Sequence, residues 1–123
     1  MKIDRLAVHK KYNGHCAYCG IKIAYEEMQV DHFWPQFLKH WQDEDNNRFE
    51  NLMPSCRKCN NFKSGMRPEE FRKELSKQVS RLLKNTQFDR ALRFGQIIIN
   101  EHPIIFHFEW IENRNEIIAN NYE

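Results

Sequence analysis

The sequence predicts an α+β domain, and three observations lead to that fold class. Short runs of alternating polar and apolar residues indicate strands at 28–33 and 51–54. A longer run after Pro68 carries apolar residues at helical spacing. Four cysteines form two C-x-x-C pairs, which is typical of a metal-stabilised fold. Because 123 residues is about the length of one domain, we expect a single domain over 1–123.

In the first half of the chain the predicted elements are short. Residues 4–12 form a short helix that leads to the first cysteine pair. A strand over 28–33 precedes one or two helical turns within 35–41. Residues 42–50 are polar and acidic, so we expect a loop there. The second strand follows at 51–54, just before the second cysteine pair.

A helical turn or more is expected from Asn60, ending near Gly65. Pro68 then begins a clearer helix, with two glutamates in its first turn. Its apolar stripe consists of Phe71, Leu75, Val79, Leu82 and Leu83. The basic residues on the rest of its surface are Arg72, Lys73, Lys77, Arg81 and Lys84. This basic surface of the helix is either simply exposed to solvent or also contacts phosphates, and the two interpretations are compatible.

Two further elements are expected near the C-terminus. Residues 88–100 form another helix, interrupted near Gly95, and the alternation over 104–110 is typical of an edge strand. We therefore expect a helical extension over 67–123 that ends in a strand.

The composition excludes a membrane protein and an ordinary secreted one. Hydrophobic residues make up 41% of the chain and charged residues 29%, the balance of a soluble globular domain. No apolar run approaches the roughly 18 residues of a membrane span, and no apolar stretch follows Met1, so we expect neither a membrane span nor a signal peptide. The net charge is only +2, but residues 57–93 hold eleven basic and four acidic side chains. This imbalance favours a polyanionic partner, unless it is simply a solvated surface.

The cysteine pairs, Cys16 with Cys19 and Cys56 with Cys59, are spaced as metal ligands. Reduced thiols are expected in a cytoplasmic chain, and four thiolates satisfy tetrahedral Zn²⁺ without an open position. We therefore predict one structural zinc ion, with a folded segment between the two knuckles. The alternative is two unrelated redox-active or buried pairs.

Around these pairs the chain carries Asp31-His32, then Glu50-Asn51-Leu52, then Cys56-x-x-Cys59-Asn60, and then Lys63. This series resembles the HNH endonuclease family, the zinc-stapled branch of the His-Me finger nucleases, over roughly residues 11–65. The family often has histidine where this chain has Asn60. The resemblance implies a small ββα-metal core with two zinc knuckles, placed at 9–66.

By resemblance, His32 is the general base, and Asp31 and Asn60 hold a catalytic Mg²⁺ or Mn²⁺. Asn51 is implied to be architectural, with a side chain that ties the loop between the strands and holds His32 in place. Because neighbouring strand residues face opposite sides of a sheet, Asp31 and His32 serve one site only if the strand end is irregular.

The resemblance also implies DNA as the substrate of the chain. Arg57 and Lys58 are candidates for contact with it, and Lys63 either contacts a phosphate or is solvated. We expect a cytoplasmic protein of a bacterial or phage-infected cell, with no membrane partner, and a homodimer is possible.

Three other functions compete with this one. A zinc-stapled nucleic-acid-binding module would bind without cleaving, although Asp31, His32 and Asn60 together argue against it. A zinc deaminase needs H-x-E before P-C-x-x-C, whereas the H-x-E at 107–109 follows the cysteines. A thiol-disulfide oxidoreductase would need a βαβ pattern near its C-x-x-C, and neither pair has one.

Overall fold

The computed structural model describes residues 3–35 and 47–113. They divide into two compact units, one of Met1–Pro68 with Ile105–Glu123 and one of Glu69–Ile104. The helical turns expected within 35–41 and most of the 42–50 loop lie outside the described residues. None of the helices in the described ranges is long and apolar enough to span a membrane.

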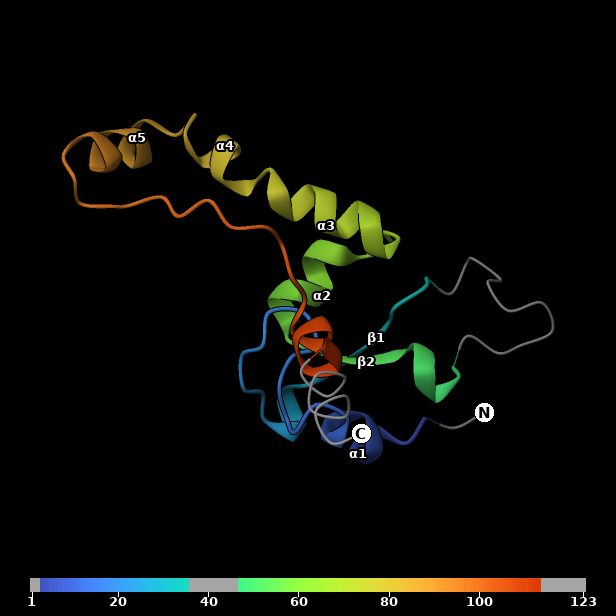
Figure 1. Ribbon diagram of the computed structural model, residues 1–123. Helices are drawn as coiled ribbons and strands as arrows, with labels where there is room; N and C mark the ends of the chain where they lie inside the picture. Colours follow the sequence, from blue (N-terminus) through green and yellow to red (C-terminus); the bar gives the residue numbers. More distant parts are fainter. Residues whose placement is uncertain (1–2, 36–46, 114–123) are drawn as a thin grey trace, which may run out of the picture. The chain divides into compact units, whose positions relative to one another are not determined.

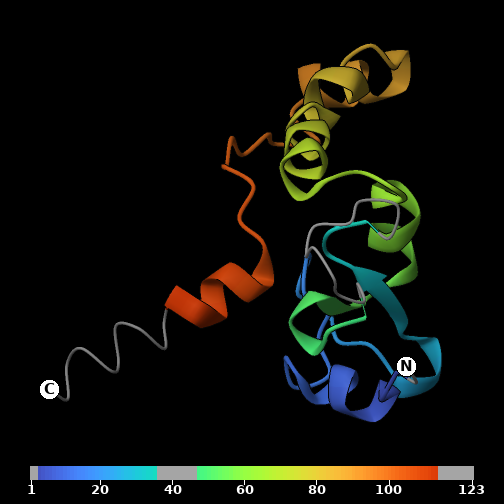
Figure 2. The same cartoon turned by 90° about the vertical axis from the view of Figure 1, so that its right-hand side faces the viewer.

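The first unit contains an antiparallel two-stranded sheet with helices on both sides (Figure 1). Strand β1 (Gln29–His32) pairs with β2 (Leu52–Ser55). Helix α1 (Arg5–Lys10) contacts β2, and α2 (Arg57–Lys63) contacts β1. Figures 1 and 2 both show α1 and α2 on opposite sides of the strand pair. The predicted mixture of helices and a small sheet is therefore confirmed.

The strand register determines which side chains enter the core. Asp31 lies opposite Met53, and His32 lies opposite Leu52. A buried apolar cluster joins one residue of α1 to the sheet and to the loop before it, and its members are Val8, Ile23, Met28 and Leu52. The Asp4 side chain caps α1 by accepting a hydrogen bond from Ala7 N. The cap and the buried Val8 explain why this short helix forms where the sequence predicted it.

The second unit contains three helices, α3 (Pro68–Ser76), α4 (Gln78–Leu82) and α5 (Thr86–Arg93). The single helix predicted from Pro68 through Leu83 is wrong, because the chain breaks at Lys77. Ser76 Oγ donates to the Lys73 carbonyl, the acceptor that Lys77 N–H would use in a continuous helix. Lys77 N–H donates to Glu74 O instead.

The break also changes the predicted apolar stripe. Phe71 of α3 is buried, whereas Val79, Leu82 and Leu83 are exposed. Helix α5 ends close to the predicted interruption, because Gly95 adopts a φ of 73° that glycine accepts at no steric cost.

The predicted edge strand over 104–110 is also wrong, since residues 107–113 are helical. Glu109 explains the difference by accepting a hydrogen bond from Phe106 N at 2.8 Å, as an acidic residue does in the first turn of a helix. The helix also packs against the first cysteine pair, where His107 N and Phe108 N donate to the carbonyls of Tyr18 and Ala17. The alternating apolar residues Phe106 and Phe108 therefore pack against the rings of Tyr18 and Phe33, and they do not pair in a sheet.

Candidate active site and zinc centre

The four cysteines gather at one place in the first unit. Their sulfur atoms all lie within 4.8 Å of one another, and the Sγ atoms of Cys19 and Cys56 are 3.8 Å apart. Tetrahedral zinc with a Zn–S distance of about 2.3 Å places its sulfurs about 3.8 Å apart. The donor set and its spacing therefore fit a structural zinc ion. Two unrelated cysteine pairs do not describe this arrangement.

The local backbone explains how the two pairs meet. Cys16 N donates to Ile21 O, and Gly20 turns the chain with a φ of 82°. Ala17 N donates to Pro54 O, which ties the first knuckle to strand β2 just before Cys56. The cysteine cluster is thus attached directly to the sheet that carries Asp31 and His32.

The close approach of the sulfurs shifts the pKa values of Cys16, Cys19 and Cys59. A hydrogen bond from Cys59 lowers the pKa of Cys16 to about 4. Burial raises the pKa of Cys19 to about 11, and the hydrogen bond with Cys16 raises that of Cys59. A divalent cation stabilises sulfurs gathered in this way, because it offsets the repulsion between neighbouring thiolates.

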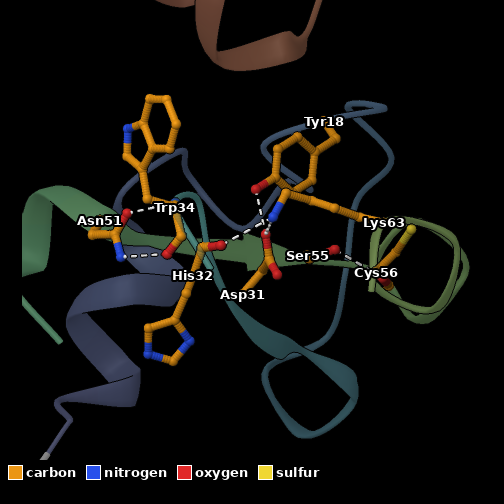
Figure 3. Close-up of polar contacts among 8 residues, drawn as sticks. All are labelled: Tyr18, Asp31, His32, Trp34, Asn51, Ser55, Cys56 and Lys63. Carbon is orange, nitrogen blue, oxygen red and sulfur yellow. Dashed lines mark hydrogen bonds and ion pairs between the residues drawn. The ribbon is translucent and has the colours of Figure 1, made fainter. Parts of the chain in front are cut away.

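Asp31 lies in a buried polar cluster beside this centre (Figure 3). Its Oδ2 accepts a hydrogen bond from the Tyr18 hydroxyl at 2.5 Å and pairs with Lys63 Nζ at 3.1 Å. Both contacts use the same oxygen. The other oxygen, Oδ1, makes no hydrogen bond to any residue in ranges 3–35 and 47–113. Burial and the Asp31 carboxylate raise the pKa of Tyr18 well above its usual value, so the phenol keeps its proton and stays a donor.

Lys63 differs from its sequence prediction. The side chain was expected either to contact a phosphate or to lie in solvent, but it is fully buried. Its ammonium donates to the His32 carbonyl at 3.0 Å and pairs with Asp31. Lys63 at the end of α2 therefore joins this helix to two successive residues of β1.

His32 presents its ring differently from its neighbour. In Figure 3 the imidazole points away from the Asp31 carboxylate, as strand alternation requires. His32 Nε2 lies 2.7 Å from Asn47 Oδ1. An amide oxygen only accepts, so in the neutral ring Nε2 carries the proton and Nδ1 keeps its lone pair. Asp31 and His32 both pair with β2 in regular register, and the chain bends only after His32, so the irregularity that was expected to bring the two side chains together does not lie between them.

Asn51 joins the end of β1 to the start of β2. Its Oδ1 accepts from Trp34 N at 2.8 Å, and its Nδ2 donates to Trp34 O at 3.1 Å. The Asn51 carbonyl also accepts from Phe33 N. The residue is fully buried, and these contacts hold the backbone that follows His32. They tie the segment after β1 to the residue that precedes β2.

The other predicted site residues lie on α2. Asn60 is half-buried, and its side chain makes no hydrogen bond to another described residue. Arg57 and Lys58 are exposed. Two residues that sequence reasoning assigned no role are Tyr18, which contacts Asp31, and Asn47, which contacts His32. No spacing rule identifies either, because each contact joins separate segments of the chain.

Comparison with known proteins gives one family. Residues 16–65 match the model of the HNH endonuclease family. Among solved structures, the crystal structure of the type II-C Cas9 enzyme from Actinomyces naeslundii is 32% identical, with a TM-score of 0.49. The match covers 58% of this chain and 7% of that enzyme, so the chain spans a small part of its length. No curated protein matches the chain. The family match covers the residues that hold the four cysteines and the Asp31 cluster, so residues 16–65 are the part of the chain that is similar to HNH endonucleases.

Proposed function

We propose that this chain is a metal-dependent endonuclease that hydrolyses phosphodiester bonds of DNA. In this proposal β1, β2 and α2 are the ββα-metal core, within a nuclease region of 9–66 that is followed by an extension over 67–123. The observation that carries the proposal is the geometry of His32, whose Nε2 is held by Asn47 while Nδ1 keeps a lone pair. The family match over the same residues supports it.

His32 Nδ1 is the proposed general base. A neutral imidazole with a free ring nitrogen can accept a proton from water. The hydroxide formed attacks phosphorus, and the bond from phosphorus to the 3′ oxygen breaks. The departing 3′ oxygen takes a proton from a solvent water, and the histidine later returns its own proton to solvent, which leaves a 5′ phosphate and a 3′ hydroxyl. Asn47 keeps the ring oriented while it gains and loses its proton.

Asp31 Oδ1 and the Asn60 amide oxygen are the proposed ligands of a Mg²⁺ or Mn²⁺ ion. Both are hard oxygen donors without a hydrogen-bond partner among the described residues. When bound, the ion supplies positive charge at the scissile phosphate and at the leaving oxygen. Lys63 pairs with Oδ2 of Asp31, which leaves Oδ1 as the oxygen for the proposed cation.

Arg57 and Lys58 are the proposed contacts to the DNA backbone, since both are exposed on α2 beside the core. No dimer interface is identified among the described residues, and the proposal needs only one chain.

Conversion of supercoiled plasmid to the nicked form tests the proposal. The purified chain is assayed with Mg²⁺, with Mn²⁺ and with chelator, beside His32→Ala. The matched control is His102→Ala, which removes an exposed histidine outside the site. We expect metal-dependent nicking by the wild-type chain and the control, and a loss of at least a hundredfold in His32→Ala with zinc and fold retained. Equal cleavage by His32→Ala refutes the assignment, and DNA binding without cleavage by the wild-type chain indicates a binding module.

A further inference from the structure

Tyr18 connects the zinc centre to the proposed catalytic carboxylate. It lies between Cys16 and Cys19 in the first knuckle and is 4% exposed. Its hydroxyl donates to Asp31 Oδ2, and Figure 3 shows the phenol and the Lys63 ammonium meeting at this oxygen. Tyr18 is therefore linked through the backbone to the cysteines at 16 and 19, and it also fixes one oxygen of Asp31, the proposed ligand of the catalytic metal.

The C-terminal segment also contacts Tyr18, both at its ring and at its backbone. The rings of Tyr18 and Phe106 contact edge to face, with centroids 5.3 Å apart, and Phe106 is 1% exposed. The backbone of the same segment is attached to the knuckle, because His107 N donates to Tyr18 O at 3.0 Å. Phe108 stacks on Phe106 and contacts Phe33 just after β1. This segment lies outside the family match at residues 16–65.

These contacts restrict how the Asp31 carboxylate can turn. Tyr18 and Lys63 approach the same oxygen from different elements, so rotation about the last side-chain bond breaks two charge-assisted hydrogen bonds. Such bonds are the means by which neighbouring groups orient a metal ligand and raise its affinity. With Oδ2 engaged, Oδ1 is the oxygen presented to a cation.

We infer that Tyr18 is a positioning residue for the catalytic metal ligand Asp31, and that Phe106 of the C-terminal segment holds Tyr18 in place. The inference rests on the proposed function, because it concerns the metal that Asp31 is proposed to bind. It assigns the segment around Phe106 to the nuclease site, although this segment follows the second unit in the sequence.

The test compares Tyr18→Phe with Tyr12→Phe in the full-length, zinc-loaded chain. Both changes remove one hydroxyl from a buried tyrosine in the same aromatic cluster, but Tyr12 makes no contact with Asp31. The probe is Mn²⁺ alone, with free ion measured by electron paramagnetic resonance. We expect Tyr18→Phe to weaken Mn²⁺ binding about tenfold or more, and Tyr12→Phe to change it less than about twofold.

A second pair of variants tests the role of the C-terminal segment. Phe106→Leu removes the ring that contacts Tyr18 but keeps an apolar side chain, and Phe94→Leu makes the same change at a residue that is 77% exposed. We expect Phe106→Leu to weaken Mn²⁺ binding about threefold to tenfold and Phe94→Leu to leave it unchanged. Zinc content and circular dichroism are recorded for each variant. The Phe106 pair also decides the question if Tyr18→Phe does not fold.

The outcomes separate this inference from the proposed function. Equal Mn²⁺ affinity in Tyr18→Phe and Tyr12→Phe, with zinc retained, overturns the positioning role. A wild-type chain that binds Mn²⁺ in a Tyr18-dependent manner but does not nick DNA overturns the proposed function and supports the positioning role. A wild-type chain that binds no Mn²⁺ overturns both. The concentration of Mg²⁺ at half-maximal nicking gives an independent readout, which we expect to rise by the same factor in Tyr18→Phe.

Discussion

The ammonium of Lys63 lies 3.1 Å from Oδ2 of Asp31, and both side chains are buried. Removing one partner of such a pair leaves an uncompensated charge out of contact with water, which is far more costly than removing both. The pair therefore joins stability and function: α2 is attached to β1 through the carboxylate that we propose as a metal ligand.

Lys63→Met is expected to lower the free energy of unfolding by about 3–5 kcal/mol, because it leaves Asp31 buried without its counter-charge. Urea denaturation of the zinc-loaded chain measures this. Lys58→Met changes an exposed lysine of the same helix and should alter stability by less than about 0.5 kcal/mol. The double variant Asp31→Asn with Lys63→Met should lose less than the two single changes added together. Equal loss in Lys63→Met and Lys58→Met would contradict the buried pair.

Asn51→Ala removes the two hydrogen bonds to the backbone of Trp34. We expect a loss of about 1–3 kcal/mol in stability, since these peptide groups lose their partner in a partly buried position. Nicking should fall further than the unfolded fraction explains, because the same backbone follows His32. Asn61→Ala, at an exposed asparagine of α2, is the control. Unchanged nicking in a folded Asn51→Ala chain would remove the architectural role.

Zinc removal is expected to unfold the first unit. Four cysteine sulfurs gathered within 4.8 Å leave a strongly destabilised thiol cluster when the cation is withdrawn. We expect one zinc per chain by elemental analysis and loss of cooperative unfolding in Cys56→Ser, which also removes the sulfur that caps α2. A chelated chain that keeps its native circular dichroism would show that the metal is dispensable.

Alkaline pH should destabilise the chain partly through Tyr12. Burial and the charge of Glu112 raise the pKa of Tyr12 to about 12, from about 10 in the unfolded chain. The unfolded state therefore loses this proton first, so stability is intact below pH 10 and falls as pH rises towards 12. In that window the wild-type chain should lose about 1.4 kcal/mol per pH unit relative to Tyr12→Phe. Parallel stability curves for the two chains would show that the phenol ionises normally.

DNA affinity should depend on salt through the exposed basic residues of α2. Arg57→Ala and Lys58→Ala each remove one proposed phosphate contact, so each should reduce the slope of log affinity against log salt by about 1. Binding is measured by fluorescence anisotropy without divalent cation. Lys84→Ala, in the second unit, is the comparison for a lysine outside the core. A salt slope unchanged in both α2 variants would exclude this face from DNA contact.

Much of the first unit was predictable because its signals are local. The spacing of Cys16, Cys19, Cys56 and Cys59 predicted one metal centre, since two residues between paired thiols let both reach one ion. Alternation predicted both strands, because side chains in a strand point to opposite faces with a period of two. The helix around Val8 followed from the same kind of short-range pattern.

The errors came where a local pattern fits two structures. The alternation around Phe106 is equally compatible with a strand and with a docked helix, and the Glu109 cap together with the aromatic rings of the first unit decides for the helix. The helix from Pro68 looked continuous by spacing, but the Ser76 hydroxyl takes a carbonyl that the next turn needs.

By itself, the sequence indicated the similarity to HNH endonucleases, the four cysteines as metal ligands, and Asp31, His32, Asn51 and Asn60 as candidate site residues, because chemistry and spacing along the chain suffice for these. Only the tertiary structure decided that Lys63 is buried against Asp31, and that Phe106 backs Tyr18. A buried lysine and a solvated one are identical in sequence. What distinguishes them is the desolvation and the partner supplied by segments far apart in the chain, which exist only once the chain has folded.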